Sequence, residues 1–335
     1  MDMYEQAEAV RAIIDGAKRV VIVQADNPDA DSLGSALALE HILGEMGKEP
    51  YLYAGVDMPG YLRYMAGWDR VSPELPKSFD ASIIVDASTM TLLDKLALSG
   101  QQGQLATKPN IVLDHHQTVD NLVPFNTVTI NDPKRASAGE LIYLLAKQLE
   151  WPVPLAAQEF IMSSILGDTQ GLTNQLASSE TYRILAEFID NGVDRPALEE
   201  LRREYGKMPP EIYRYKADLI KRTEFAADNR IASVIIPQSE INEFSPLYNP
   251  GPLIQGDMLQ TAGVQLAIVL KSYTDGKITA AIRGNATAPV AGKLAEHFGG
   301  GGHAFASGFK VLDKQLDQLK TDMLAFATQL LDEVD

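Results

Sequence analysis

Short apolar runs alternate with helical patterns along the first half of the chain. The runs lie at 20–24, 50–55, 82–87 and 110–116, and the segment 33–43 has the apolar periodicity of a helix. Ser137 and Glu140 have the spacing of a capping box at the start of a later helix. Strands that are this uniformly apolar are typical of a parallel sheet buried on both faces. We therefore predict an α/β fold with a doubly wound parallel sheet.

The second half shows a separate set of apolar runs after a charged, helical stretch with paired prolines at 198–222. Those runs, at 232–237, 264–273 and 277–284, predict strands. Because a chain of 335 residues is too long for one hydrophobic core of average size, we assign these strands to a second, smaller α/β domain. We expect a first domain over 1–195, a helical connection over 196–222 and a second domain over 223–335.

The composition narrows the classes of partner and of metal site. The chain has no Cys, which excludes disulfides and thiolate ligands, and 29 Lys and Arg against 45 Asp and Glu give a net charge of −16. Such a charge disfavours binding of long duplex nucleic acid. No apolar run approaches the ~18 residues that a membrane span needs. The first residues carry acids where a signal peptide carries Lys or Arg. We predict a cytoplasmic protein without membrane contact.

Acidic side chains follow three of the apolar runs and end one later helix. They are Asp29 and Asp31 after the first run, Asp86 at the third, Asp114 with His115 and His116 at the fourth, and Asp168 in the helix. Because parallel strands share one carboxyl edge, we expect these side chains to meet in one pocket. Two like charges ~4 Å apart repel by about 4 kcal/mol at an effective dielectric of ~20, so protons or cations must be present.

The ligand types favour a particular chemistry. A single Asp after a strand is usually a helix N-cap, but two adjacent histidines at the end of an apolar strand have no packing reason. Carboxylate oxygen with imidazole suits Mn²⁺ or a similar divalent ion. Two ions that share one carboxylate would offset the charge and support phosphoester hydrolysis.

A run of four glycines precedes His303 near the end of the chain. A helix C-cap accounts for one or two of them, and the exposed N–H groups of such a loop can bind phosphate. Arg283, at the end of a predicted strand, has the geometry for a bidentate phosphate contact. The predicted substrate-binding residues are therefore Arg283, Gly300, Gly301, Gly302 and His303.

Five segments, in this order, resemble the DHH phosphoesterase family with its DHH-associated C-terminal domain: NPDADSLGS, IIVDAS, LDHH, LGDT and GGGGHAFASGF. The similarity is greatest to the bacterial oligoribonuclease/pAp-phosphatase (nanoRNase) proteins. It implies a manganese-dependent phosphoesterase with a two-Mn²⁺ site, Mg²⁺ being the alternative metal. It also implies that the glycine run, Arg283 and His303 hold the terminal nucleotide of a short substrate.

The resemblance implies roles for the site residues. The first ion would be bound by Asp29 and Asp86, and the second by Asp31, Asp86, His115 and Asp168. His116 would face the scissile phosphate and Asp114 would orient the two histidines, as carboxylates do at metal sites.

The expected activity is hydrolysis of short RNA oligonucleotides or linear dinucleotides to mononucleotides, with pAp as a second substrate, by a monomer or homodimer. One alternative is a cyclic dinucleotide phosphodiesterase. Another is a nucleotide-binding member of the family in which catalysis is weakened or lost.

The first motif departs from the family pattern. The family has a His four positions before the first Asp, and this chain has Ala25 there. The first ion would therefore lack its imidazole ligand. Three replacements are open: Asp26, Gln24 or water.

Overall fold

A computed structural model of the chain describes residues 4–116, 122–245 and 248–334. The chain forms two compact units, Met1–Lys207 and Met208–Asp335, and passes from one to the other inside the stretch expected to connect two domains. Among the described residues, no helix is both long enough and apolar enough to cross a membrane.

The first unit is built on a five-stranded, all-parallel sheet with the order β2-β1-β3-β4-β5. Its strands are β1 (Arg19–Val23), β2 (Glu49–Tyr53), β3 (Ala81–Val85), β4 (Asn110–Asp114) and β5 (Val128–Asn131). The predicted doubly wound sheet is confirmed. β5 was not predicted, because only Ile130 of its four residues is buried and the segment has no apolar run.

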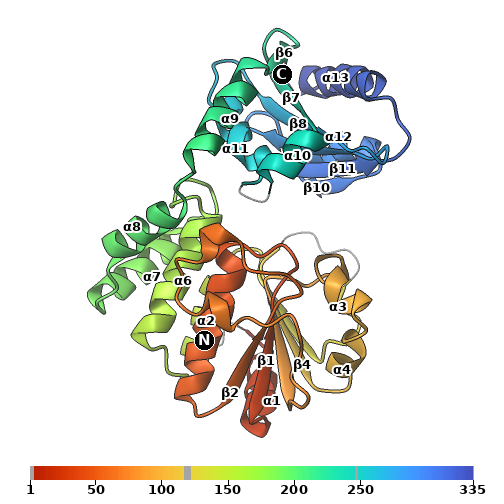
Figure 1. Cartoon of the computed structure of the whole chain (residues 1–335). Helices are drawn as coiled ribbons and strands as arrows, with labels where there is room; N and C mark the ends of the chain where they lie inside the picture. Colours follow the sequence, from red (N-terminus) through yellow and green to blue (C-terminus); the bar gives the residue numbers. More distant parts are fainter. Residues whose placement is uncertain (1–3, 117–121, 246–247, 335) are drawn as a thin grey trace. The chain divides into compact units, whose positions relative to one another are not determined.

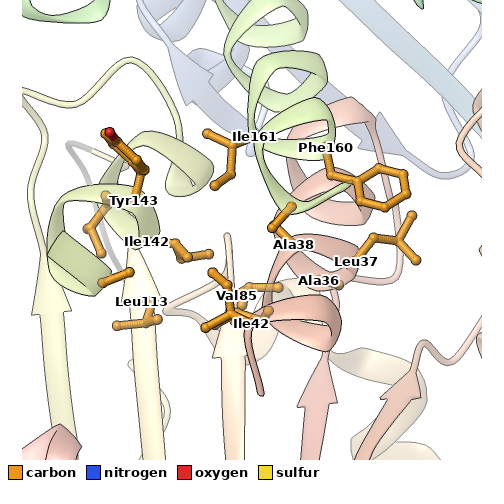
Figure 2. Close-up of a cluster of buried hydrophobic side chains, with 14 of the residues drawn as sticks. Ala36, Leu37, Ala38, Ile42, Val85, Leu113, Ile142, Tyr143, Phe160 and Ile161 are labelled. Carbon is orange, nitrogen blue, oxygen red and sulfur yellow. The ribbon is translucent and has the colours of Figure 1, made fainter. Parts of the chain in front are cut away.

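Helices cover both faces of this sheet (Figure 1). The helices on one side are α3 (Asp94–Leu98) and α4 (Gln102–Ala106), and those on the other include α1 (Ala7–Gly16), α2 (Ala30–Glu45), α5 (Ala138–Gln148), α6 (Leu155–Asp168) and α7 (Ser179–Asp190). The unit also contains α8 (Arg195–Tyr205) and the short 3₁₀ turns Gly60–Leu62, Trp68–Arg70 and Met90–Leu92. Figure 2 shows side chains of α2, α5 and α6 in one cluster with Val85 of β3 and Leu113 of β4.

Glycines let α2, α5 and α6 approach one another closely. A Cβ atom at Gly34 of α2 would lie 2.7 Å from the backbone oxygen of Phe160, and one at Gly139 of α5 would lie 2.2 Å from Ser164 Oγ. At Gly167 of α6, a Cβ atom would lie 2.7 Å from that of Ala30. The three helices therefore meet at the carboxyl edge of the sheet, where several of the predicted acids lie.

The second unit has a six-stranded mixed sheet with the order β10-β11-β9-β8-β7-β6. Its strands are β6 (Glu224–Ala226), β7 (Ile231–Pro237), β8 (Leu266–Ser272), β9 (Ile278–Gly284), β10 (Gly301–His303) and β11 (Ala306–Val311). Its helices are α9 (Pro210–Lys221), α10 (Gln238–Phe244), α11 (Pro250–Leu259), α12 (Ala291–His297) and α13 (Leu316–Asp332). α12 and α13 pack on one face, and α9 and α11 pack over β7 and β8 on the other. This unit is the predicted second α/β domain.

Candidate metal centre

The strand order of the first unit creates a switch point between β1 and β3, where chain connections leave in opposite directions. In open α/β sheets, ligands bind at the carboxyl ends of the strands beside such a point. Asp29 lies near this edge as the N-cap of α2, and its Oδ1 accepts hydrogen bonds from the backbone N–H groups of Asp31 and Ser32, both at 3.0 Å. The side chain therefore has the N-capping role that is common for an Asp after a strand.

Asp31 is fully buried in the first turn of α2 and is held by several donors. Its Oδ1 accepts hydrogen bonds from Ser35 Oγ (2.8 Å) and Ser164 Oγ (2.7 Å), and its Oδ2 accepts one from the backbone N–H of Ala138 at the start of α5 (2.8 Å). Burial opposes ionisation, but these contacts and His115 hold the pKa of Asp31 below its usual value. The N-termini of two helices thus stabilise one carboxylate.

Asp86 follows β3 in a left-handed conformation with φ 55°, which re-aims its side chain after the strand ends. Its Oδ1 is buried and has no hydrogen-bond partner among the described residues. Burial raises the pKa of Asp86 well above its ordinary value, and the negative charges of Asp31 and Asp29 raise it further. A cation would favour the ionised form.

His115 brings three carboxylates together. Its Nδ1–H donates to the backbone oxygen of Arg135 (3.3 Å), because a carbonyl can only accept. Its Nε2 lies 3.0 Å from Asp168 Oδ2, 3.3 Å from Asp31 Oδ2 and 3.6 Å from Asp86 Oδ1. Burial opposes protonation, but Asp168 and Asp31 raise the pKa of His115 to about 12. A proton on Nε2 therefore occupies the place that a cation would take.

His116 is oriented by Asp114, as expected for a carboxylate that positions the histidine pair. The Nδ1–H of His116 donates to Asp114 Oδ1 at 2.7 Å, and Asp114 also accepts hydrogen bonds from the His115 N–H (2.8 Å) and from Ser88 Oγ. Burial opposes ionisation of Asp114, but the contacts with His116 and Ser88 lower its pKa. An ionised Asp114 fixes the Nδ1–H tautomer of His116.

Two groups within the described parts of the chain have ligand atoms close enough to hold a metal ion. One contains Asp31, His115 and Asp168, and the other contains Asp86, His115 and His116. In each group the ligand atoms lie within 4.8 Å of one another. Asp29 belongs to neither group, although its charge raises the pKa of Asp86. His116, expected to face substrate, lies among candidate ligands.

The donor set fits a divalent ion that accepts oxygen and nitrogen ligands. His115 Nε2 and Asp86 Oδ1 are buried polar atoms without a hydrogen-bond partner in the described structure, yet they lie beside other ligand atoms. Buried polar atoms are rarely left unpaired unless an ion or water completes them. Carboxylate and imidazole together suit Mn²⁺.

We expect metal binding to release protons from this site. Burial and the charge of Asp31 raise the pKa of Asp168 to about 6, and the pKa of His115 is raised to about 12, so an incoming ion competes with protons. Mn²⁺ affinity should therefore increase between pH 5 and 8, by at most about tenfold per pH unit for each proton displaced. Calorimetry in buffers of different ionisation enthalpy counts these protons. A binding constant that does not change with pH would contradict the expectation.

The structure narrows the candidates for the missing imidazole. Ala25 is buried in the apolar cluster on the α3 and α4 side of the sheet. Asp26 Oδ2 accepts a hydrogen bond from the backbone N–H of Lys95 (2.7 Å), and its pKa is raised by burial and by Asp94. Asp26 is therefore bonded at the start of α3, and it belongs to neither candidate metal group of the described residues.

The predicted substrate-binding residues lie in the second unit. Arg283 is exposed on β9, with no hydrogen bond or ion pair to other described residues. Strand register places Arg283 beside Ala306 of β11, and Ala306 beside position 303 of β10. The side chain of His303 lies outside the described residues.

The glycine run has structural causes at three of its four positions. Gly299 and Gly302 have φ values of 78° and 137°, and a Cβ atom at Gly300 would lie 2.2 Å from the backbone oxygen of Gly308. A Cβ atom at Gly301 would meet nothing within 4 Å among the described residues. Close pairing of β10 with β11 therefore explains most of this run without a ligand.

Several residues contact the site without having been predicted as site residues, and three of them lie outside α2 and α5. Ser164 bonds to Asp31, Ser88 bonds to Asp114, and the backbone oxygen of Arg135 accepts from His115. Ser164 lies four positions before Asp168 on α6, so helical spacing could have indicated it. The other two depend on long-range packing that has no signal in the sequence.

Comparisons with known proteins agree with this fold. The chain is 26% identical over 295 residues to a bifunctional oligoribonuclease and PAP phosphatase of Thermus thermophilus, covering 87% of this chain and 84% of that protein. The fold is similar to that of an exopolyphosphatase-related protein from Bacteroides fragilis, with a TM-score of 0.84, 22% identity and coverage of 98% and 97% of the two chains. It is also similar to Thermus thermophilus RecJ in complex with Mn²⁺ (TM-score 0.53, 18% identity, 97% of this chain and 54% of that one).

The family match covers the part of the chain that carries most of the candidate metal centre. Residues 19–166 match the DHH family, N-terminal domain. Asp29, Asp31, Asp86, His115 and His116 fall within these residues, and Asp168 follows them by two positions. The similarity to the DHH family, N-terminal domain, therefore includes five of these six candidate ligands.

Proposed function

We propose that this protein is a metal-dependent phosphodiesterase that hydrolyses short RNA oligonucleotides or linear dinucleotides to mononucleotides, with pAp as a second substrate. The observation that carries the proposal is the convergence of three carboxylates on His115 Nε2, at 3.0–3.6 Å. Several carboxylates this close together repel one another unless a proton or a cation lies among them. A bound metal ion would supply that positive charge. Similarity to an oligoribonuclease and PAP phosphatase supports the substrate class.

We propose Mn²⁺ as the resident ion, held at two positions. Asp31, His115 and Asp168 would hold one ion, Asp86 and Asp29 would hold the other, and Asp86 would bridge them. RecJ, which has a similar fold, binds Mn²⁺, and the ligand types here suit that ion. When bound, two divalent ions activate water for attack on phosphorus and stabilise both the attacking and the leaving oxygen.

The residues of the chain have distinct roles in this proposal. Asp31 is held rigidly by the N-terminus of α5 and by Ser35 and Ser164, so its position does not depend on substrate. Asp114 keeps the proton of His116 on Nδ1, and the Nε2 atom of His116 would then contact the phosphate. This arrangement pre-organises the site before substrate binds.

A direct assay tests the proposal. Purified protein with Mn²⁺ is incubated with a labelled RNA dinucleotide, a five-residue RNA, pAp and cyclic di-AMP in parallel. We expect the dinucleotide and the five-residue RNA to be converted to mononucleotides and pAp to lose a phosphate. Faster cleavage of cyclic di-AMP than of the linear dinucleotide would contradict the proposed substrate class. Binding of the nucleotides without hydrolysis would contradict the proposed activity.

Arg283 gives a separate prediction for the second unit. Because it is an exposed cation without a partner among the described residues, we propose that it binds a substrate phosphate. Arg283→Ala should raise KM for the dinucleotide about 10- to 100-fold with a smaller effect on kcat, as expected when a charged hydrogen bond of about 1.5–3 kcal/mol is lost. Lys293→Ala, at an exposed position on α12, is the matched control and should leave KM unchanged. Equal KM values for the two variants would remove Arg283 from the proposed binding site.

A further inference from the structure

Gln24 is a fully buried amide at the end of β1, and neither its Oε1 nor its Nε2 atom has a hydrogen-bond partner among the described residues. A buried polar group without a partner destabilises the folded protein. An amide with both its oxygen and its nitrogen unpaired is therefore unfavourable unless an ion, a ligand or water binds to these atoms. Such a group requires an explanation from its surroundings.

The register of the sheet places Gln24 next to the candidate metal centre. β1 pairs with β3 so that Val23 lies beside Ile84, which brings Gln24 beside Val85, the residue before Asp86. The side chains along β1 alternate, with Val20 and Ile22 in the cluster that includes α2, and Val21, Val23 and Ala25 in the opposite one. Continuation of the alternation puts Gln24 on the α2 face, which also carries Asp31.

The unpaired atoms at this edge form a pattern. Gln24 Oε1 and Nε2, Ser32 Oγ, Asp86 Oδ1 and His115 Nε2 are all buried without hydrogen-bond partners in the described parts of the chain. They come from the ends of β1, β3 and β4 and from the first turn of α2, which surround the switch point of the sheet. Among the alternatives for the missing imidazole, Ala25 carries no ligand atom. Asp26 also has a buried oxygen without a partner among the described residues, Oδ1, but its Oδ2 is bonded to the backbone N–H of Lys95 and its Oδ1 would lie 2.8 Å from a Cβ atom at Gly55, on the α3 side.

We infer that Gln24 replaces the missing histidine and supplies its amide oxygen as a neutral ligand to the ion shared by Asp86 and Asp29. This inference rests on the proposed two-ion function. An amide oxygen is a hard ligand that suits Mn²⁺ and Mg²⁺. The ion would satisfy the oxygen half of the group, and the Nε2 atom of the same amide would remain a hydrogen-bond donor.

The test is a measurement of ion binding, independent of hydrolysis. Mn²⁺ binding to wild type, Gln24→Leu and Gln24→Glu is followed by calorimetry and by the electron paramagnetic resonance signal of free Mn²⁺. We expect wild type to bind two ions, and Gln24→Leu to lose at least about tenfold in affinity for one of them while the other is unchanged. Gln24→Glu, which keeps an oxygen at the same position, should retain both ions. Gln158→Leu, at another buried glutamine of the first unit, is the matched control and should bind both ions as wild type does.

A second signature separates a ligand from a structural residue. Because Leu removes an unpaired buried amide, the metal-free Gln24→Leu protein should melt no lower than wild type, while its rise in melting temperature on Mn²⁺ addition should be smaller. If Gln24→Leu binds both ions with wild-type affinity, the inference fails and the proposed function stands. If Gln24→Glu loses the same ion as Gln24→Leu, the amide oxygen is not the ligand. If wild type binds no Mn²⁺, the proposed function fails with it.

Discussion

Asp86→Asn is expected to lower Mn²⁺-dependent hydrolysis about 10³-fold or more. Asp86 would bridge the two ions with its two oxygens and its charge, whereas Asn offers one neutral oxygen and could not serve both ions, so the stabilisation of the transition state would be lost. Asn is the appropriate substitution because it has nearly the same shape and tolerates the left-handed φ of 55° at this position, which Ala does not. The measurement is kcat and KM for a labelled RNA dinucleotide, together with the number of ions bound.

Stability gives an independent readout for the same variant. Burial raises the pKa of Asp86 in the folded protein above the pKa that it has in the unfolded chain. At any pH above the unfolded value, this difference lowers the free energy of unfolding, and an Asn side chain, which does not ionise, removes the effect. The metal-free Asp86→Asn protein should therefore melt at a higher temperature than wild type near pH 7. Asp313→Asn is the matched control, since Asp313 is an exposed acid of the second unit with φ 57°. If Asp86→Asn hydrolyses the dinucleotide with the kcat of wild type, the two-ion proposal is wrong.

His116→Gln is expected to lower kcat about 100-fold or more while both ions remain bound. Protonation or hydrogen bonding by a positioned histidine contributes about 10²–10⁴-fold to such reactions. Asp114→Asn should show part of the same loss, because a neutral amide oxygen holds the proton of His116 Nδ1 less strongly than the carboxylate does. The measurements are kcat, its pH profile and the stoichiometry of Mn²⁺.

The stoichiometry decides between two roles for His116. Its ring belongs to a group of potential ligands with Asp86 and His115, so a variant that loses one ion would make it a ligand and not a phosphate contact. His41→Gln is the control, because His41 packs against Phe160 with a ring distance of 5.5 Å and has no proposed role in the site. It should leave kcat and ion binding unchanged.

The sequence predicted which side chains converge at the candidate metal centre, but it did not predict the hydrogen bonds that hold them. The acids at the ends of β1, β3 and β4 could be found because an apolar run followed by Asp marks the carboxyl edge of a buried parallel strand. The adjacent histidines had no packing explanation, and the structure brings His115 within 3.6 Å of three carboxylates. The pattern of apolar runs followed by acids therefore predicted that these side chains converge, because convergence depends only on the topology of the sheet.

The individual contacts depend on packing between distant segments and could not be predicted. Ser137 caps α5, but the predicted capping box is wrong, because Glu140 accepts a hydrogen bond from Thr181 Oγ1 (2.7 Å). Arg135 lies close to Glu180 (2.5 Å), 45 positions away, in addition to its local contact with Asp132 (3.0 Å). Asp26 likewise lies on the α3 side because its Oδ2 accepts a hydrogen bond from the backbone N–H of Lys95, 69 positions away.

The close approach of α2, α5 and α6 gives the glycines beside the candidate metal centre a role of their own. Gly34 lies three positions after Asp31, Gly139 precedes Glu140, and Gly167 precedes Asp168, so each of these three helices carries an acid close to a glycine. The two kinds of residue answer different requirements. The acids carry charge, and the glycines set the distance between helix axes, since a Cβ atom at any of the three would collide with a neighbouring helix. A segment such as DADSLGS therefore contains both the acids of the candidate metal centre and the glycine that sets the distance between α2 and α6. A larger residue at Gly34 would push these helices apart while leaving every candidate ligand in the sequence.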